Sequence, residues 1–361
     1  MGEERITIIA VEDITDRKKT EKKITYLTYH DQLTGLYNRR FFEGELKRLD
    51  KKKQLPLSIV IADLNGLKLV NDTLGHSMGD KIIKKVALLL KKACRSDDIL
   101  ARWGGDEFIF LLPKTQSEVS EKFSKKIKKY CKRLIVKKIP VSISVGIATK
   151  IDLEENIAET IIDAENNMYK NKLLEKDSSL RSTISALKQV LFEKSHETSQ
   201  HTERLKNIAL KIGKLVKLHP EQLDDLSLLA SLHDIGKVAI PESILNKRDE
   251  LTEKEWAIIK RHPEIGFNIV SSSPRIAHIS TYILSCHEKW DGSGYPQGLK
   301  GEDIPIISRI TFIADAYDAM THKRPYKEAM SKNEAIKELR RYSGTQFDPV
   351  LVEKLIQVIS K

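Results

Sequence analysis

The sequence predicts two domains: an α+β domain with a central sheet, followed by an all-α domain. The chain has 361 residues, and at about 150 residues per domain this length suits two domains. In the first half, short apolar runs rich in β-branched residues alternate with helical patterns. From about Ser182 onward the helical periodicity continues, but no convincing strand pattern appears.

The predicted elements follow from this periodicity. Strands are expected at 57–63, 107–112 and 141–148, and helices at 41–49, 80–92, 119–136 and 156–174. Helical patterns in the second half cover 187–191, 205–215, 223–232, 253–270 and 350–359. The polar stretch Glu175–Ser179 is the best boundary, which gives domains at 30–177 and 178–361.

Residues 1–29 form a third, small piece that is too short to be a domain. Residues 5–14 could be one strand, and a charged helix follows at 16–27. This pair resembles the last strand and exit helix of a PAS sensor module, which implies an upstream sensor. A plain N-terminal helix is the alternative.

Composition excludes several classes of protein. Apolar residues make up 40% and charged residues 31%, which is ordinary for a globular chain and rules out disordered and collagen-like classes. No apolar run reaches the roughly 18 residues of a membrane helix, and the start lacks a signal-peptide layout. The three cysteines are far apart, so a disulfide framework is not expected and a reducing cytoplasm is.

The net charge is +11, and much of the excess lies in residues 122–138. Phe123, Ile127, Tyr130 and Leu134 recur there at helical spacing. This pattern indicates an amphipathic helix with a solvated lysine face. No aromatic residues interleave on that face as a base-stacking surface requires, so a nucleic-acid partner is not expected.

A first candidate site combines carboxylates with glycines. Asp63 ends a predicted buried strand, and Gly66 and Lys68 follow it, a layout in which loop amides and a lysine hold phosphates. Gly104–Glu107 reads as a tight turn leading into a strand. Two antiparallel strands could bring Asp63 and Asp106 together around Mg²⁺. From these residues alone, a plain turn at 104–107 is an equally good interpretation.

Several motifs occur in order at the spacing of a known family. They are Gly104-Gly105-Asp106-Glu107-Phe108, DQLTGLYNRR at 31–40, ADLNGLKLVND at 62–72, Gly75-His76, Gly79-Asp80, SISVGIA at 142–148 and MYKNK at 168–172. Residues 25–176 thus resemble the GGDEF-family diguanylate cyclases. The resemblance implies a mostly antiparallel sheet of the nucleotidyl-cyclase, ferredoxin-like palm type. It also implies condensation of two GTP molecules into cyclic di-GMP by a homodimer, since each domain holds one GTP.

The resemblance also implies residue roles. Mg²⁺ or Mn²⁺ would be bound by Asp63, the Leu64 carbonyl and Asp106, and Asp106, with Glu107 beside it, would assist deprotonation of the ribose hydroxyl. Guanine would be recognised by Asn71 and Asp80. The triphosphate would be held by Lys68, Lys172 and Lys176. Asn65 and Leu67 depart from the usual Asp-Phe, and Lys176 stands where arginine is common. A lysine keeps the charge but loses the bidentate fork, which implies weaker triphosphate binding.

Arg95 and Asp98 match the RxxD product-inhibition site of the same family. An arginine can grip a guanine edge or a phosphate with two hydrogen bonds. A surface ion pair is the alternative interpretation.

A second candidate site lies in the all-α half. Six histidine and aspartate residues stand beside small residues or at helix turns: His201, His233, Asp234, His262, His287 and Asp315. Metals explain such a set better than isolated structural roles do. Burying Asp234 unpaired at the end of an apolar helix would be costly, and a position between two cations removes that cost.

The ordered motifs of this half resemble the HD-GYP family of HD-domain phosphohydrolases. They are HETSQHT at 196–202, HDIGK at 233–237, RHPEIG at 261–266, HEKWDGSGYPQGL at 287–299, IADAYDAM at 313–320 and HKRPYKEA at 322–329. The resemblance implies hydrolysis of cyclic di-GMP to pGpG or GMP at a centre of two or three Fe or Mn ions, with Zn as a further option. Cys286 stands where the family usually has a histidine, which implies either a thiolate ligand or an underligated site.

By motif position, the resemblance implies seven metal ligands: Glu197, His201, His233, Asp234, His262, His287 and Asp315. Lys237 would stabilise the phosphate or assist the leaving group. The substrate would be contacted by Tyr295, Arg324 and Lys327. The histidines at 196, 219, 278 and 322 match no ligand position. The two resemblances together imply a bacterial, bifunctional enzyme of cyclic di-GMP signal transduction. The alternative is that one half is catalytic and the other is a nucleotide-binding regulatory module.

Overall fold

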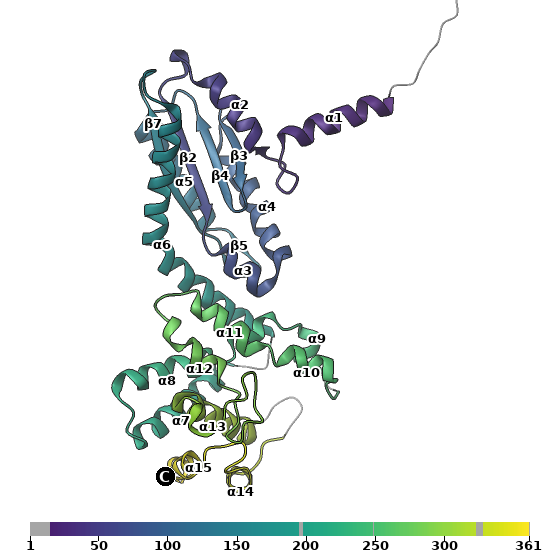
Figure 1. Cartoon of the computed structure of the whole chain (residues 1–361), viewed down its shortest axis with the longest axis vertical. Coiled ribbons are helices and arrows are strands. Elements are labelled where there is room, and N and C mark those ends of the chain that lie inside the picture. Colours follow the sequence, from purple (N-terminus) through teal and green to yellow (C-terminus); the bar gives the residue numbers. More distant parts are fainter. Residues whose placement is uncertain (1–14, 195–197, 248, 323–327, 361) are drawn as a thin grey trace, which may run out of the picture. The chain divides into compact units, whose positions relative to one another are not determined.

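The computed structural model describes residues 15–194, 198–247, 249–322 and 328–360 (Figure 1). Contacts divide the chain into two compact units. The first contains the chain up to Leu64 together with residues 80–133 and 142–173, and the second contains residues 65–79, 134–141 and 174 onward. The predicted strand at 5–14 lies outside the described residues.

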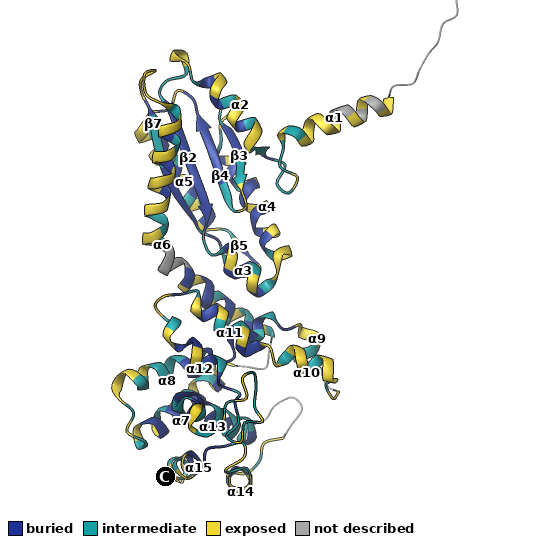
Figure 2. Cartoon of the chain, viewed as in Figure 1, coloured by how far each residue is buried: buried dark blue, intermediate teal, exposed yellow. Residues whose placement is uncertain are grey.

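A five-stranded sheet forms the centre of the first unit. Its strands are β1 (Tyr37–Asn38), β2 (Leu57–Leu64), β3 (Ile99–Gly104), β4 (Glu107–Leu112) and β7 (Ile143–Lys150). Their order is β1-β3-β4-β2-β7, with β1 parallel to β3 and every other neighbour antiparallel. All eight residues of β2 are buried, and Figure 2 shows this strand in dark blue. The predicted α+β class with a mostly antiparallel sheet is thus confirmed.

Helices cover both faces of this sheet. They are α2 (Arg39–Leu49), α4 (His76–Ala93), α5 (Ser117–Lys132) and the first part of α6 (Ile157–Lys194), with a short 3₁₀ turn at Lys52–Gln54. Helix α1 (Thr15–Tyr29) precedes them and contacts α2. On one face, Phe42 of α2 and Met168 of α6 pack with Ile59 and Ile61 of β2. A Cβ on Gly146 of β7 would lie 2.1 Å from backbone atoms of α6, so this glycine permits their close packing. On the other face, Phe110 of β4 meets Phe123 of α5 edge-on.

The second unit is built mainly from helices packed on helices. They are α7 (Ser199–Leu215), α8 (Pro220–Leu232), α9 (Glu242–Leu245), α10 (Glu253–Ile259), α11 (His262–Ser271), α12 (Ser280–Leu284), α13 (Ile306–Thr321), α14 (Lys332–Arg341) and α15 (Pro349–Ile359). Short 3₁₀ turns lie at Ile235–Ala239, Ala277–Ile279 and Gly301–Asp303. Within the described residues from 174 onward, the only strand-like pairing is an isolated bridge between Ser343 and Phe347. The predicted all-α class is confirmed.

Two predicted helices were wrong in extent. The helix predicted to reach Val136 ends at Lys132, and residues 135–140 form a hairpin, β5 (Ile135–Val136) and β6 (Ile139–Pro140). Its turn residues Lys137 and Lys138 both have positive φ, the geometry of a two-residue hairpin turn. The helix predicted at 253–270 is split into α10 and α11, because Pro263 begins a new helix in its first turn.

Several helices and strands of the structure were not predicted from the sequence. The strands β1 and β3 and the helices α3 (Leu67–Leu74), α13 and α14 were not predicted. The charged helix expected at 16–27 corresponds to α1. The polar stretch at 175–179 lies inside α6, so the boundary proposed there stays a prediction.

Candidate active sites

The sheet brings the predicted carboxylates of the first half together. Asp63, at the end of β2, pairs in register with Glu107 at the start of β4. The amide of Leu64 donates a hydrogen bond to the carbonyl oxygen of Asp106 at 3.1 Å. Antiparallel pairing of β2 with β4 therefore places Asp63, Asp106 and Glu107 at one end of the sheet, as the sequence predicted.

Asp63 is buried and only partly neutralised by protein groups. Its side chain is 4% exposed, and its Oδ2 accepts a hydrogen bond from Lys172 Nζ at 2.7 Å. Burial, with the charges of Asp106 and Glu107, raises the pKa of Asp63 to about 6 despite Lys172. Its Oδ1 is buried without a hydrogen-bond partner in the part of the chain that the structure describes. A buried carboxylate oxygen beside two further carboxylates fits a hard divalent cation.

An arginine missed by the sequence reasoning holds the turn that carries Asp106. Arg102 of β3 donates through Nε and Nη2 to the Gly105 carbonyl at 3.1 and 2.6 Å. Its Nη1 lies 3.1 Å from both carboxylate oxygens of Asp31, which also caps Thr34. The signal was available, since Asp31 opens the DQLTG motif and Arg102 lies two residues before Gly104.

The other predicted nucleotide-binding residues lie on neighbouring helices. Lys68 and Asn71 belong to α3, and Asp80 to α4. A Cβ on Gly79 would lie 1.9 Å from Oδ1 of Asn71, so only glycine leaves room for this amide. The side chain of Lys176 lies outside the described residues.

The predicted inhibitory pair lines a cavity of about 600 Å³. Asp98 Oδ2 accepts from the backbone amide of Arg95 at 2.7 Å. Among the described residues no ion pair joins the Arg95 guanidinium to Asp98, so the surface ion pair considered as the alternative is not formed.

In the second half, a close helix approach positions the His233-Asp234 pair. His233 ends α8 and Asp234 begins the 3₁₀ turn at Ile235–Ala239. A Cβ on Gly236 would lie 1.9 Å from the His262 carbonyl oxygen and 2.7 Å from the Gly266 amide nitrogen. Glycine at 236 therefore lets this turn lie against α11, which carries His262.

Two groups of ligand-type side chains converge here, one of His201, His233 and Asp315 and the other of Asp234, His262 and His287. The ligand atoms within each group lie within 4.8 Å of one another. The Asp234 carboxylate lies between the groups: its Oδ2 is 3.2 Å from Nε2 of His233, and its Oδ1 is 3.2 Å from Nε2 of His262.

Two of these imidazoles, His262 and His233, present a lone pair at Nε2, and Nε2 of His287 lies 2.9 Å from Nε2 of His262. His262 Nδ1 lies 2.8 Å from the Ile259 carbonyl oxygen, and His233 Nδ1 lies 3.2 Å from that of Ala230. A carbonyl oxygen can only accept, so these Nδ1 atoms carry the protons and the Nε2 atoms carry lone pairs. Burial lowers the pKa of His262 to about 4, which keeps this imidazole neutral. Converging lone pairs and a carboxylate fit divalent metal ions.

Asp318 and Arg204 complete the surroundings of His201 and were not predicted. Asp318 Oδ2 lies 2.6 Å from His201 Nδ1, and its Oδ1 accepts from Arg204 Nε at 2.7 Å. Burial would raise the pKa of Asp318, but the bonds from His201 and Arg204 outweigh it and hold this pKa well below its usual range. The signal was the three-residue spacing from Asp315 on α13, which puts both carboxylates on one helix face.

Lys237 and Tyr295, which the sequence analysis assigned to the phosphate and the substrate, lie beside the centre. Lys237 Nζ donates to Asp234 Oδ2 at 2.6 Å. Burial would raise the pKa of Asp234, but the charge of Lys237 opposes it, and this pKa lies well below its usual value. The ring of Tyr295 stacks on His287 with centroids 5.3 Å apart. Glu288 fixes the loop after Tyr295 by accepting from the amides of the next turn.

The remaining predicted residues divide into three sets. Cys286 is buried beside the centre but belongs to neither ligand group, and burial, with the charges of Asp234 and Asp315, raises the pKa of its thiol well above the usual value. His278 pairs with Asp225 at 2.9 Å, His219 lies at the start of α8, and His322 Nδ1 lies 3.1 Å from Asp318 Oδ1. The calls on His196, Glu197, Arg324 and Lys327 lie outside the described residues.

Comparison with known families now adds to this geometry. Residues 28–178 match the family described as "Diguanylate cyclase, GGDEF domain", and residues 185–351 match "HD domain". The chain carries a GGDEF domain followed by an HD domain. The recognition made from the sequence motifs is thus confirmed at the level of these two families. The HD domain implies dependence on divalent metals, in keeping with the two ligand groups.

Curated relatives of this GGDEF–HD chain are phosphodiesterases. It is 40% identical over 179 residues to the cyclic di-GMP phosphodiesterase response regulator RpfG of Xanthomonas campestris, covering 49% of this chain and 47% of the relative. It is 40% identical over 164 residues to a cyclic di-GMP phosphodiesterase of Thermotoga maritima, covering 45% of each. It is 42% identical over 166 residues to 3'3'-cGAMP-specific phosphodiesterase 2 of Vibrio cholerae, covering 45% of this chain and 32% of the relative.

The chain therefore spans less than half the length of these relatives. Among solved structures it is similar to the diguanylate cyclase SiaD of Pseudomonas aeruginosa, with a TM-score of 0.40, 27% identity and coverage of 45% of this chain and 67% of SiaD. No helix within the described residues combines the length and the hydropathy needed to cross a membrane.

Proposed function

We propose that this protein turns over cyclic di-GMP, hydrolysing it in the HD domain and synthesising it from two GTP molecules in the GGDEF domain. The observation that carries the proposal is the Asp234 carboxylate lying between two groups of ligand-type side chains. Two metals held by these groups would suit phosphodiester hydrolysis, because they would lower the pKa of a bound water and neutralise charge on the phosphate. The relatives' names support a cyclic dinucleotide as the substrate.

Protein groups around this centre have separate tasks in the hydrolysis. Asp234 serves both ligand groups, and Ile259 and Ala230 fix the imidazole tautomers that leave Nε2 free to bind. Lys237 brings a positive charge within 2.6 Å of Asp234, where it can stabilise the phosphate or assist the leaving group. Tyr295 offers an aromatic ring above His287 for contact with the substrate.

The substrate could carry two guanines or one guanine and one adenine, since relatives of both specificities are similar to this chain. These nucleotides share the phosphodiester ring that the metals would act on, and they differ in one base. We assign cyclic di-GMP because the GGDEF domain of the same chain belongs to the family that makes it. Linear pGpG and GMP are the two candidate products.

The GGDEF domain would act through position and charge. Asp63 and Asp106 would hold Mg²⁺ or Mn²⁺, which offsets charge on the triphosphate. Asp106 would accept the proton of the ribose hydroxyl, and Lys172, now on Asp63, would reach the triphosphate. Each domain holds one GTP, so synthesis requires a homodimer.

Product analysis tests the proposal directly. The full chain is incubated with GTP and Mg²⁺, and separately with cyclic di-GMP or 3'3'-cGAMP and Mn²⁺. Asp106→Ala should abolish synthesis and leave hydrolysis within a few-fold, and Asp234→Ala should do the reverse. Asp152→Asn, a change at an exposed carboxylate, is the control.

The outcomes test the role of Asp106, the two-metal centre and the activity of the GGDEF domain separately. Synthesis that survives Asp106→Ala would refute the role of Asp106, and hydrolysis that survives Asp234→Ala would refute the two-metal centre. A parent chain that hydrolyses cyclic di-GMP but makes none from GTP would leave the GGDEF domain as a regulatory module.

A further inference from the structure

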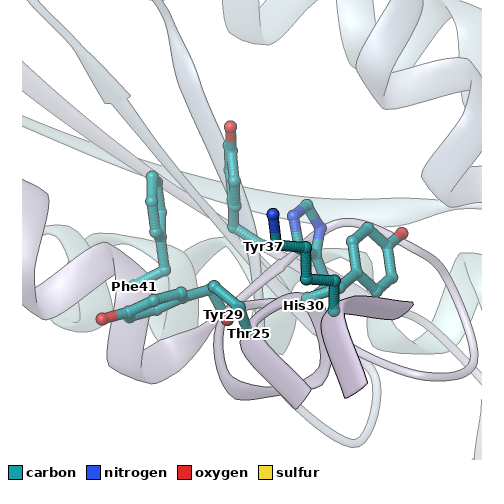
Figure 3. Close-up of a pocket in the computed structure, with 7 residues that line it drawn as sticks. Thr25, Tyr29, His30, Tyr37 and Phe41 are labelled. Atoms are coloured by element: carbon teal, nitrogen blue, oxygen red, sulfur yellow. The ribbon is translucent and has the colours of Figure 1, made fainter. Parts of the chain in front are cut away.

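A second cavity of the GGDEF domain is lined mainly by aromatic rings (Figure 3). This aromatic cavity has a volume of about 550 Å³. Its rings are those of Tyr26 and Tyr29 of α1, His30, Tyr37 of β1 and Phe41 of α2, and Lys18 and Thr25 of α1 complete the lining. The rings form a continuous series. Tyr26 stacks on His30 with centroids 4.0 Å apart, and Tyr37 stacks on Phe41 at 3.7 Å. Tyr29 meets Phe41 edge-on at 5.8 Å.

The aromatic cavity adjoins the cavity that contains the predicted inhibitory pair. Tyr37 and Phe41 line both, so each of these rings serves two cavities. The second one, here called the charged cavity, is also lined by Arg95, Asp98 and Lys114. Its third cation, Arg48, pairs with Glu45, and Glu45 and Asp97 also line this cavity.

The two cavities offer complementary chemistry to one ligand. In the charged cavity, arginine and lysine suit phosphate, and an arginine with a carboxylate suits the edge of a guanine. Aromatic rings suit the face of a planar base, and such stacking tolerates any base because every base has a π face. A cyclic dinucleotide carries both kinds of group, with two phosphates and two bases in one molecule.

We propose that the aromatic cavity is a subsite for one nucleobase of a cyclic dinucleotide whose phosphates and other base occupy the adjoining charged cavity. The proposal rests on the proposed function, because it takes cyclic di-GMP as the ligand of the Arg95 site. It adds a role for Tyr29, Tyr37 and Phe41 that no sequence motif assigned.

This subsite would also connect the nucleotide to α1. Tyr26 and Tyr29 belong to α1, whereas Tyr37 and Phe41 belong to β1 and α2. Both tyrosines of α1 remain accessible, with exposed fractions of 50% and 40%. A base seated among these rings would contact both sides, so the product would fix the end of α1 against the catalytic domain.

Equilibrium binding of cyclic di-GMP to the full chain tests the subsite. EDTA in the buffer prevents hydrolysis, and the part of the binding that Arg95→Ala removes defines the inhibitory site. Tyr29→Leu and Tyr37→Leu keep apolar volume but remove the π face, and each should weaken that part about tenfold. Tyr37→Phe keeps the ring and should stay within about twofold, and Tyr169→Leu, at an exposed tyrosine of α6, is the control.

The outcomes separate this inference from the proposed function. Arg95-dependent binding that is present in the parent and unchanged in both leucine variants would overturn the subsite alone. A parent without any Arg95-dependent binding would overturn the inhibitory site and the subsite with it. Unchanged affinity in Tyr29→Leu together with a weaker dimer would refute the subsite and assign the rings to a subunit contact. Tyr29 is exposed, so its variant stays informative even if Tyr37→Leu fails to fold.

Discussion

Changing Asp318 to asparagine should remove metal from one of the two ligand groups of the HD domain without altering any ligand. Asp318 accepts from His201 Nδ1 at 2.6 Å on one side and from Arg204 Nε at 2.7 Å on the other. Asparagine has almost the same shape but only one acceptor oxygen. Arg204 donates to both oxygens of Asp318, through Nε to Oδ1 at 2.7 Å and through Nη2 to Oδ2 at 3.0 Å, and His322 Nδ1 lies 3.1 Å from Oδ1. The asparagine oxygen should keep the Oδ1 position, where it meets the shorter Arg204 contact and His322, and the amide NH₂ then faces His201.

The expected size of the effect follows from this tautomer change. An NH₂ group facing Nδ1 of His201 favours the tautomer with its proton on Nε2, the atom that lies 3.5 Å from Asp315. The ring then presents a proton where a metal needs a lone pair. Loss of such an orienting partner typically costs about 10- to 100-fold in metal affinity, or about 1.4–2.7 kcal/mol. The group of Asp234, His262 and His287 keeps its own partners.

Metal content after desalting and hydrolysis rate against added Mn²⁺ are the measurements. Asp318→Asn should lose metal on desalting and regain activity at 10- to 100-fold higher Mn²⁺. The matched control is Asp225→Asn, the same change in the Asp225–His278 pair, whose histidine is 52% exposed and belongs to neither ligand group. If Asp318→Asn keeps the metal content and Mn²⁺ dependence of the parent, the tautomer argument fails.

Three further changes test other parts of the molecule. Arg95→Ala should relieve product inhibition of synthesis without raising the initial rate much, and progress curves that flatten at the parent's product level would contradict this. Cys286→His should raise metal content and hydrolysis, because the buried neutral thiol supplies no ligand in its present form; a parent already fully loaded would refute an underligated site. Without metal, Asp63 keeps its proton to about pH 6 in the folded chain, above its ordinary pKa of 3.8, so stability should fall as the pH rises from about 4 to 6. Asp63→Asn should remove that slope from a series of thermal midpoints measured in EDTA.

The sequence predicted best where a motif coincides with a complete element. Strands β2 and β4 were predicted almost to the residue, because a buried strand reads as a continuous apolar run with clear ends. Strand β3 was missed because Arg102 and Trp103 interrupt its apolar run, although Arg102 is needed to hold the turn at Gly105. The polar side chain of Arg102, which holds the turn, thus weakened the sequence pattern that would have predicted β3.

The candidate metal ligands were predictable for a related reason, and their partners were not. His201, His233 and Asp315 stand in recognisable motifs, but contacts such as His201 with Asp318 join residues 117 positions apart. The tautomers depend on backbone carbonyls of Ile259 and Ala230, which every residue type supplies equally. Sequence patterns thus identify the candidate metal-binding side chains, whereas contacts made by the fold determine which nitrogen of each imidazole carries the lone pair.

The two candidate centres each contain a buried aspartate, but they shift its pKa in opposite directions and offer different kinds of metal ligand. Asp63 and Asp234 each accept from a lysine, at 2.7 and 2.6 Å. Yet the pKa of Asp63 rises to about 6, because burial is joined by the charges of Asp106 and Glu107, whereas that of Asp234 falls well below its usual value. The first centre offers carboxylate oxygens, which favour Mg²⁺ or Mn²⁺. The second mixes imidazole nitrogens with carboxylates, which favours Fe, Mn or Zn. A single added cation is therefore expected to support the two reactions unequally, and Mn²⁺ is the ion that both donor sets accept.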